Sequence, residues 1–248
     1  MNPLFKSTVI RSFQKILSKF GMKITRLARS PTVEDLIFQS FAHAKEVRFI
    51  QVGAHDGTHN DPISLFRNRP NWSGLLLEPN PRVYARLVKT LAKSSPSCQA
   101  LNVAISEEGG VMSFYLVRNP ELCRGGHFSD QVSSFDRSHV EKMVGKFGYS
   151  QSESNYWIEE TKVDTITFAN LLDRLPNKHL DLLFIDAEGA DFRLLKTFPF
   201  AHFRPRMLVF EFAHLTTDEI REIMPFLSEN GYSFVAIGED IVATSWPP

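Results

Sequence analysis

The sequence predicts a doubly wound α/β fold, in which a mostly parallel sheet has helices on both faces and ends in a C-terminal antiparallel hairpin. Short runs that are apolar almost throughout, such as 47–52 and 181–185, alternate with amphipathic segments. Strands of this kind are typical of parallel sheets that are covered on both faces. The final pair of strand-like runs, 232–237 and 241–245, favours the closing hairpin.

Length and composition agree with one α/β domain. The chain has 248 residues, of which 43% are hydrophobic, enough for a sizeable core and too much for a disordered chain. A formal net charge of zero gives no global electrostatic argument for nucleic acid as a partner. The two cysteines lack metal-site spacing and favour a reduced, cytoplasmic compartment. No apolar run has the length of roughly 18 to 20 residues that spans a bilayer.

The first 31 residues differ in composition from the remaining chain, 32–248. They contain seven Lys or Arg residues and no acid, and apolar residues recur at helical spacing, which predicts a basic amphipathic helical extension. Docking of this helix on its own domain or on a second subunit, as in a homodimer, is the first interpretation. Peripheral contact with the anionic inner face of the membrane and an organelle-targeting role are the alternatives.

The first half of the domain contains three expected strand–helix units. A helix with an apolar face is expected at 33–44, ahead of the first strand. Pro81 stands where a proline is favoured in the first turn of a helix. The expected elements that follow are a strand at 47–52, a crossover helix at 61–69, a strand at 74–77, a helix at 81–93 and a strand at 100–105.

The regular alternation breaks in the middle of the chain and then resumes. An added strand is expected at 111–117. The segment 119–155 is polar, Gly- and Ser-rich and long for a plain connection, which favours a lid-like insertion. The later elements are a helix at 167–174, a strand at 181–185, a helix from Asp191, a strand at 207–212, a helix at 218–230 and the terminal hairpin.

The carboxyl ends of the first two strands carry the residues expected to bind a ligand, because open α/β sheets bind ligands there. Gly53 and Gly57 follow the first strand and permit backbone angles that other residues avoid. Glu78 ends the second strand, about where an acid would hydrogen-bond both hydroxyls of a ribose. A solvated strand-end acid is the bland alternative for Glu78 alone, but its distance from the glycine loop favours a nucleotide-type site.

Several motifs in order resemble the FkbM family of methyltransferases. The first two follow the first and second strands, and the most specific is the run 185–189, Ile-Asp-Ala-Glu-Gly. The similar segments cover roughly 47–237 and leave the basic N-terminus outside. They are 52–57 (VGAHDG), 77–81 (LEPNP), 102–106 (NVAIS), 133–135 (SSF), 163–166 (VDTI) and 181–191 (DLLFIDAEGAD).

The resemblance implies a class I, Rossmann-like fold and an enzyme that uses S-adenosylmethionine, in most members for O-methylation of sugars or secondary metabolites. Glu78 would hold the ribose. The residues implied at the methionine part of the cofactor are Gly53, His55, Asp56 and Gly57, and those beside the adenine are Asn80, Asn102 and Val103. The sequence departs from the wider class at Gln51, where many members carry an acid, and at His55, where many carry a second glycine.

Acidic residues at the later strand ends are the candidates for catalysis. Methyl transfer needs mainly positioning, but an alcohol must also lose its proton to a nearby base. Asp186 is the first candidate base and Glu188 a second contact to the acceptor, with helix-dipole interaction as the alternative for Glu188. His127, beside two glycines in the expected lid, is the third candidate. No metal is favoured, although Asp186 and Glu211 could hold Mg²⁺.

The sequence therefore predicts a methyltransferase that acts by in-line transfer on a hydroxyl of a small molecule or glycan, and not on nucleic acid. A divalent-metal-assisted O-methyltransferase of a diol is the alternative. A nicotinamide-dependent Rossmann oxidoreductase is less favoured, because GxGxxG is absent.

Overall fold

The computed structural model describes residues 31–58, 61–213 and 215–245, without the side chains of His127 and Pro176. The basic N-terminal extension predicted over 1–31 therefore lies almost entirely outside the described residues. From Val33 onward, the described residues cluster as one compact unit. Within the described ranges, no helix combines the length and the apolar character needed to cross a membrane.

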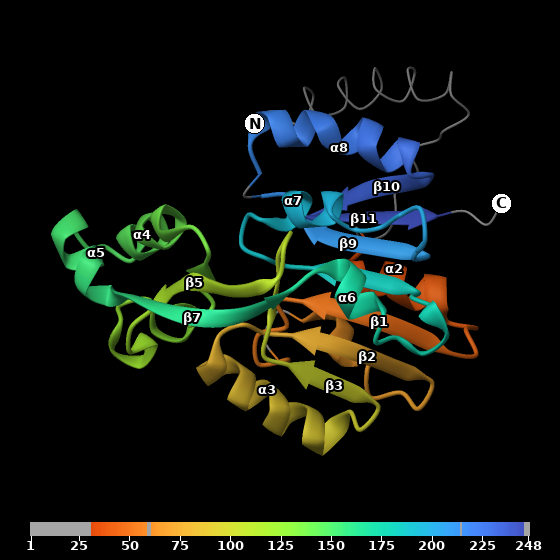
Figure 1. Ribbon diagram of the computed structural model, residues 1–248, viewed down its shortest axis with the longest axis horizontal. Coiled ribbons are helices and arrows are strands. Elements are labelled where there is room, and N and C mark those ends of the chain that lie inside the picture. Colours follow the sequence, from red (N-terminus) through yellow and green to blue (C-terminus); the bar gives the residue numbers. More distant parts are fainter. Residues whose placement is uncertain (1–30, 59–60, 214, 246–248) are drawn as a thin grey trace, which may run out of the picture. The chain divides into compact units, whose positions relative to one another are not determined.

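A sheet of seven strands forms the centre of this unit, in the order β10-β11-β9-β8-β1-β2-β3 (Figure 1). Neighbours from β3 to β9 are parallel, whereas β11 is antiparallel to both β9 and β10. The predicted fold class is confirmed. The last strand of the chain, β11, lies between β9 and β10. The strands are β1 (Val47–Val52), β2 (Trp72–Leu77), β3 (Cys98–Leu101), β8 (Leu182–Ile185), β9 (Met207–Glu211), β10 (Tyr232–Ile237) and β11 (Asp240–Ser245).

Helices cover both faces of the seven-stranded sheet. Phe49 of β1 belongs to a buried cluster with α2 and α3, and its neighbour Ile50 belongs to a second cluster with α6, α7 and α8. Because consecutive side chains of a strand point to opposite faces, an apolar pair at this position requires burial on both sides. The helices are α2 (Val33–Phe41), α3 (Pro81–Ser94), α6 (Phe168–Leu172), α7 (Asp191–Lys196) and α8 (Thr217–Glu229), with a short 3-10 turn, η5 (Pro176–Lys178).

The crossover helix predicted at 61–69 is wrong. Only a 3-10 turn forms there, η2 (Pro62–Leu65), followed by further turns up to Pro70. The Asp61 carboxylate accepts from the backbone N–H of Ile63 and pairs with the buried guanidinium of Arg67. These contacts pull the segment toward the protein interior before a regular α-helix can form. Pro70 would also stop any α-helix that extended beyond Arg69.

The single strand predicted at 100–105 is also wrong, because the chain leaves the sheet after Leu101 and resumes as β4 (Ala104–Ile105) in a different sheet. Asn102 explains the break. Its Nδ2 donates to the carbonyl oxygens of Glu78 at 2.8 Å and Pro79 at 3.0 Å, which turns the backbone at the sheet edge.

The second sheet has the order β4-β7-β5-β6. Its long antiparallel pair consists of β5 (Gly110–Val117) and β7 (Ile158–Ile166), and β6 (Ser133–Ser134) is its edge strand. The added strand expected at 111–117 is confirmed as β5. Sequence analysis did not predict β7, because its run of IEETKVDTI is largely polar and only half-buried.

The segment 119–155 contains more regular structure than its composition suggested. It packs around a small core of its own, which includes Val132, Val140 and Val144. Its helices begin at strong caps, Asp136 for α4 and a Ser150–Glu153 capping box for α5. The elements are η3 (Pro120–Leu122), η4 (Gly126–Phe128), α4 (Arg137–Lys146) and α5 (Gln151–Trp157). Figure 1 shows α4 and α5 beside the far end of the β5–β7 pair.

Candidate active site

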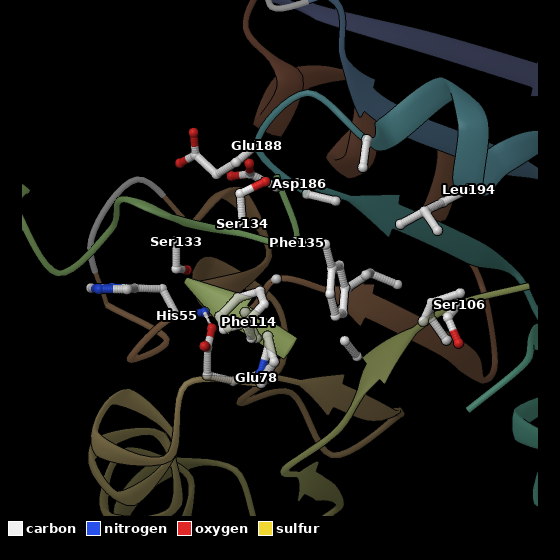
Figure 2. Close-up of a pocket in the computed structure, with 18 of the residues that line it drawn as sticks. His55, Glu78, Ser106, Phe114, Ser133, Ser134, Phe135, Asp186, Glu188 and Leu194 are labelled. Carbon is white, nitrogen blue, oxygen red and sulfur yellow. Dashed lines mark hydrogen bonds between the residues drawn. The ribbon is translucent and has the colours of Figure 1, made fainter. Parts of the chain in front are cut away.

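A cavity of about 870 Å³ opens at the carboxyl ends of β1, β2, β8 and β9. Side chains of β5 and β6 and the loops beside them form its other wall, so that the two sheets enclose it. Figure 2 shows Asp186 and Glu188 extending from the loop after β8, and Glu78 at the end of β2. The location agrees with the general position of ligand sites in open α/β sheets.

Gly53 begins the loop that follows β1. Its backbone φ is +76°, and its N–H donates to the carbonyl oxygen of Leu77 at 3.0 Å. A Cβ at this position would lie 1.8 Å from the carbonyl oxygen of Asp186. The glycine is therefore required by the close approach of the β1 and β8 ends as well as by its left-handed conformation.

His55 also has a left-handed backbone, with φ of 47°. Its backbone N–H donates to Glu78 at 3.0 Å, and its ring Nε2 lies 3.2 Å from Oδ1 of Asp130. Burial lowers the pKa of His55, but the hydrogen bond and charge of Asp130, together with Asp56 and Glu78, outweigh burial and raise it above its usual value. Asp130 comes from the 119–155 segment, so this contact joins that segment to the glycine loop.

Glu78 is 5% exposed and lines the cavity. One carboxylate oxygen accepts from the N–H of Asn80 at 2.8 Å and the other from the N–H of His55. Burial raises the pKa of Glu78 to about 7, against these hydrogen bonds and the charge of His55. Each oxygen can accept a further hydrogen bond, which suits the two hydroxyls of a ribose.

Four of the residues expected to contact the cofactor do not line the cavity and instead support its loops. Asp56 accepts from the N–H of Thr58 at 2.9 Å, and the carbonyl oxygen of Gly57 accepts from Arg67. Asn80 caps α3, and Asn102 holds the chain at the end of β2. Val103, in contrast, lines the cavity.

The loop after β8 carries the candidate catalytic acids Asp186 and Glu188, and Asp191 holds this loop in place. Asp191, fully buried, accepts from the N–H groups of Ala187 and Gly189, each at 3.2 Å, and so holds the loop. Glu188 has a left-handed φ of 49°, and its carboxylate lies 3.7 Å from Nε2 of His139 on α4. Burial, with the charge of Asp186, raises the pKa of Asp191 to about 7.

The Asp186 side chain is open to the cavity, yet protein atoms surround the cavity, so a ligand can reach a carboxylate that bulk water solvates poorly. The protein atoms that surround the carboxyl group keep water from it, and with the nearby charges of Glu188, Glu211 and Asp240 they raise the pKa of Asp186 to about 8. Burial and neighbouring acids likewise raise the pKa of Glu211 to about 8.

The cavity is strongly acidic and partly aromatic. Besides the strand-end acids, Glu239 of the β10–β11 turn and Asp240 at the start of β11 line it, with Arg193 as a cationic neighbour. Phe114 and Phe135 pack edge to face, with ring centroids 5.1 Å apart, on the wall opposite the main sheet. In the part of the chain that is described, no group of three or more His, Cys, Asp or Glu side chains is arranged to hold a metal ion.

S-adenosylmethionine fits these residues. It carries a net positive charge, which an acidic cavity stabilises, and its ribose diol matches the two oxygens of Glu78. The cavity volume also falls within the range of small-molecule sites.

The cavity includes residues that the sequence did not predict, and one predicted residue has a side chain outside the described part of the chain. His127 lies in η4, and its side chain falls outside the described part of the chain. Sequence analysis did not single out Asp130, Leu194, Glu239 and Asp240, all of which line the cavity. An acid pair in a turn at the carboxyl edge of the sheet was the available signal for Glu239 and Asp240. Asp130 had no local signal, because only the tertiary fold brings it to His55.

The chain matches the family described as methyltransferase FkbM domain over residues 51–234. No curated protein sequence matches it at a significant level. A similar solved structure is a precorrin-6y C5,15-methyltransferase from Geobacter metallireducens, with 13% identity, a TM-score of 0.44 and coverage of 92% of this chain and 94% of that chain. Another is methyltransferase FkbM from Methylobacillus flagellatus, with 12% identity, a TM-score of 0.47 and coverage of 81% and 44%.

The family match spans the glycine loop, Glu78 and the Asp186–Glu188 loop, which all line the cavity. The family match contradicts the alternative that the chain is a nicotinamide-dependent oxidoreductase. The chain therefore belongs to the FkbM family of S-adenosylmethionine-dependent methyltransferases.

Proposed function

We propose that this enzyme transfers a methyl group to a hydroxyl of a sugar, glycan or secondary metabolite, with Asp186 as the base. The observation that carries the proposal is the Asp186 carboxylate, open to the cavity and with a pKa raised to about 8. An alcohol must lose its proton as it is methylated, and a base whose pKa lies near the working pH accepts that proton efficiently.

S-adenosylmethionine supplies a methyl group bonded to a positively charged sulfur. A positive charge in the cavity favours the ionised form of Asp186, because opposite charges stabilise each other in a poorly solvated site. Cofactor binding would thus convert the carboxyl group into a proton acceptor. When bound, the cofactor would supply the methyl group to the acceptor oxygen and leave as S-adenosylhomocysteine, while Asp186 would take the hydroxyl proton.

The remaining cavity wall suits an uncharged, ring-bearing acceptor. Phe114 and Phe135 present aromatic surface, and Ser133 and Glu188 add groups that hydrogen-bond to hydroxyls. The excess of carboxylates over Arg193 would repel phosphates. We extend the proposal to acceptors that are small molecules or glycans and not nucleic acids.

The test uses methyl-labelled S-adenosylmethionine with a panel of monosaccharides, glycosides and hydroxylated metabolites. We expect label on an acceptor oxygen, and a loss of kcat of at least about 100-fold in Asp186→Asn with cofactor binding retained. Glu239→Gln is the matched control, because it removes another cavity carboxylate and should retain most of the activity. Transfer to nitrogen or carbon, or unchanged kcat in Asp186→Asn, would overturn the proposal.

The same assay separates the metal-assisted alternative. In the metal-assisted mechanism, a chelator would stop turnover, Mg²⁺ would restore it, and both Asp186→Asn and Glu211→Gln would be inactive. That outcome would make Asp186 a ligand of a metal that binds the substrate diol, in place of a base. A His127→Ala variant in this assay tests the third catalytic candidate.

A further inference from the structure

The backbone of Glu188 is held in an unfavourable conformation at the edge of the cavity. Its φ is 49°, in the left-handed region that residues with a Cβ rarely adopt. The fully buried Asp191 keeps this shape, because its carboxylate accepts from the N–H groups of Ala187 and Gly189, on either side of the strained residue. Strain of this kind is concentrated at functional sites, which points to a role for the Glu188 side chain.

The Glu188 carboxylate is accessible to a ligand. Its side chain is 27% exposed and lines the cavity, and Figure 2 shows it extending from the same loop as Asp186. Burial and then the charge of Glu188 are the two largest causes that raise the pKa of Asp186 to about 8, so the two carboxyl groups lie close together. A ligand that reaches Asp186 therefore also meets Glu188.

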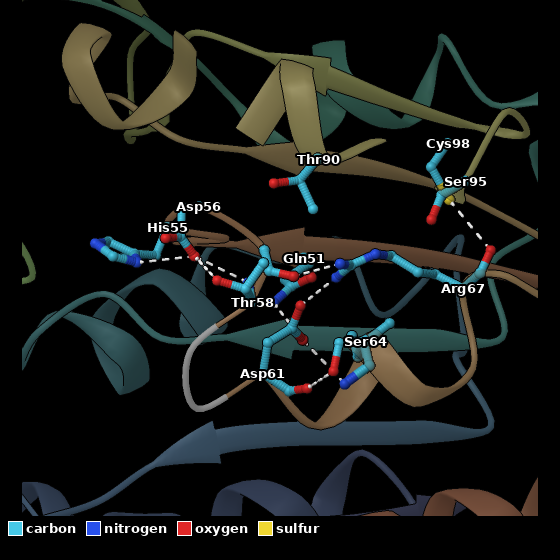
Figure 3. A network of polar contacts seen from close by, with 12 residues as sticks. Gln51, His55, Asp56, Thr58, Asp61, Ser64, Arg67, Thr90, Ser95 and Cys98 are labelled. Atoms are coloured by element: carbon cyan, nitrogen blue, oxygen red, sulfur yellow. Dashed lines mark hydrogen bonds and ion pairs between the residues drawn. The ribbon is translucent and has the colours of Figure 1, made fainter. Parts of the chain in front are cut away.

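The acids that follow β1 are engaged by the protein itself. Asp56 accepts from the N–H and the hydroxyl of Thr58. Asp61 pairs with the buried guanidinium of Arg67 (Figure 3). Glu188 differs from both, because its side-chain contact among the described residues comes from a distant segment, the helix α4.

His139 is the α4 side chain that faces Glu188. Its Nε2 lies 3.7 Å from a carboxylate oxygen of Glu188, and its side chain is only 17% exposed. Asp136 caps α4 by accepting from the N–H of Ser138 at 2.8 Å, which places His139 in the first turn of the helix, beside the cavity wall. The distance of 3.7 Å is slightly long for a hydrogen bond, but contacts in ligand-free sites often shorten when a substrate binds.

A carboxylate only accepts hydrogen bonds, and the donors of an uncharged sugar or metabolite are its hydroxyls. We propose that His139 donates to one oxygen of Glu188 and so directs the other oxygen to a second hydroxyl of the acceptor, next to the hydroxyl that is methylated. The acceptor is then a vicinal diol, with one hydroxyl at Asp186 and its neighbour at Glu188. This inference rests on the proposed transfer to a hydroxyl.

The role of His139 is positioning. A glutamate side chain has three rotatable bonds, and a fixed partner limits them before the acceptor arrives, which lowers the entropy lost on binding. A diol held at its second hydroxyl also presents one defined oxygen to Asp186. The pair His139–Glu188 thus determines both the class of acceptor and the hydroxyl that is methylated.

The experiment compares diols with analogues that lack the neighbouring hydroxyl, with a chelator present. The probes are methyl hexosides with their monodeoxy analogues, and catechol with phenol. For the wild-type enzyme we expect the KM of the analogue to be at least about tenfold higher than that of the diol, because the analogue leaves the Glu188 carboxylate without its donor.

Two variants of His139 measure its contribution. His139→Leu should raise the KM of the diol about tenfold with kcat within about twofold, because the second hydroxyl is bound equally before and during methyl transfer. The KM of the analogue should change by less than about twofold. His139→Gln, whose amide nitrogen can donate from a similar position, should restore most of the affinity for the diol. Lys142→Leu is the matched control, because Lys142 is an exposed residue of the same helix.

Glu188→Gly separates this role from folding. Glycine relieves the left-handed backbone, so the midpoint of urea denaturation should not fall. The KM of the diol should nevertheless rise at least about tenfold. Addition of His139→Leu to this variant should cause no further rise, because the two side chains act through one contact.

Equal changes for diol and analogue in His139→Leu would give His139 a structural role and overturn the proposal. Equal KM values for the two in the wild-type enzyme would also contradict it. Either result would leave the proposed hydroxyl transfer intact. Activity lost with the chelator would assign the diol to a metal in place of Glu188. A wild-type enzyme that methylates no hydroxyl compound would refute the proposed function, and with it the role of His139.

Discussion

Gly53 and Asp186 meet backbone to backbone where β1 and β8 end. The N–H of Asp186 donates to the carbonyl oxygen of Val52 at 3.0 Å, and a Cβ on Gly53 would lie 1.8 Å from the carbonyl oxygen of Asp186. The residue that opens the loop after β1 thus also sets the position of the candidate base. A change at Gly53 should therefore affect both parts of the site.

Gly53→Ala should lower the free energy of unfolding by about 3 kcal/mol or more, because strain in a left-handed conformation adds to the overlap with Asp186. Urea denaturation followed by circular dichroism measures this loss. Gly238→Ala is the control, because Gly238 also has a positive φ, of +63°, but no atom lies within 4 Å of an added Cβ. It should cost only about 1 kcal/mol. Similar losses in the two variants would show that the contact with Asp186 is unimportant.

Glu78→Gln should weaken binding of S-adenosylhomocysteine by at least about tenfold, because a charged acceptor for the ribose is replaced by a neutral amide that offers only one oxygen. Calorimetry measures the change, with the exposed Glu46→Gln as control. An unchanged dissociation constant for Glu78→Gln would place the ribose elsewhere.

Asp130→Asn should lower the pKa of His55 toward its usual value of about 6.5, because the hydrogen bond and charge of Asp130 are the main causes that raise it. The titration of the His55 ring by NMR gives this value directly. Asp56→Asn should have a smaller effect, since the Asp56 carboxylate lies 3.5 Å from the ring and contributes less. A larger shift in Asp56→Asn than in Asp130→Asn would contradict the assignment.

Stability without ligand should fall as the pH rises from about 4 to about 8. The pKa of Asp186 is about 8 in the folded protein and about 3.9 in an unfolded chain, so over this window the folded state holds a proton that the unfolded state has lost. The raised pKa values of Glu78, Asp191 and Glu211 act in the same direction.

Urea denaturation at about pH 5.5 and about pH 8.5 measures this dependence. Asp186→Asn should reduce the difference between the two values, because an amide does not titrate. Binding of S-adenosylmethionine at neutral pH should release protons, seen as a dependence of the calorimetric heat on the buffer. Higher stability at the higher pH would rule out the stated electrostatics.

The sequence alone determined the fold class and the edge of the sheet where the cavity lies. The apolar strands β1, β2, β8 and β9 were predicted because burial on both faces leaves an unbroken apolar run. Gly53, Glu78 and Asp186 follow such strands directly, so local sequence placed all three at one edge, and the structure finds them in one cavity.

Only the tertiary structure decided the second sheet and the inner partners of the site. The polar strand β7 is stable because it pairs with β5 over eight register positions, and no pattern within its own sequence reports that pairing. Asp61 looked like the start of a helix, yet its carboxylate turns inward to Gln51 and Arg67. Contacts such as His55 with Asp130 join residues far apart in the chain. Side-chain hydrogen bonds of this kind depend on distances and orientations that only the packed sheets define.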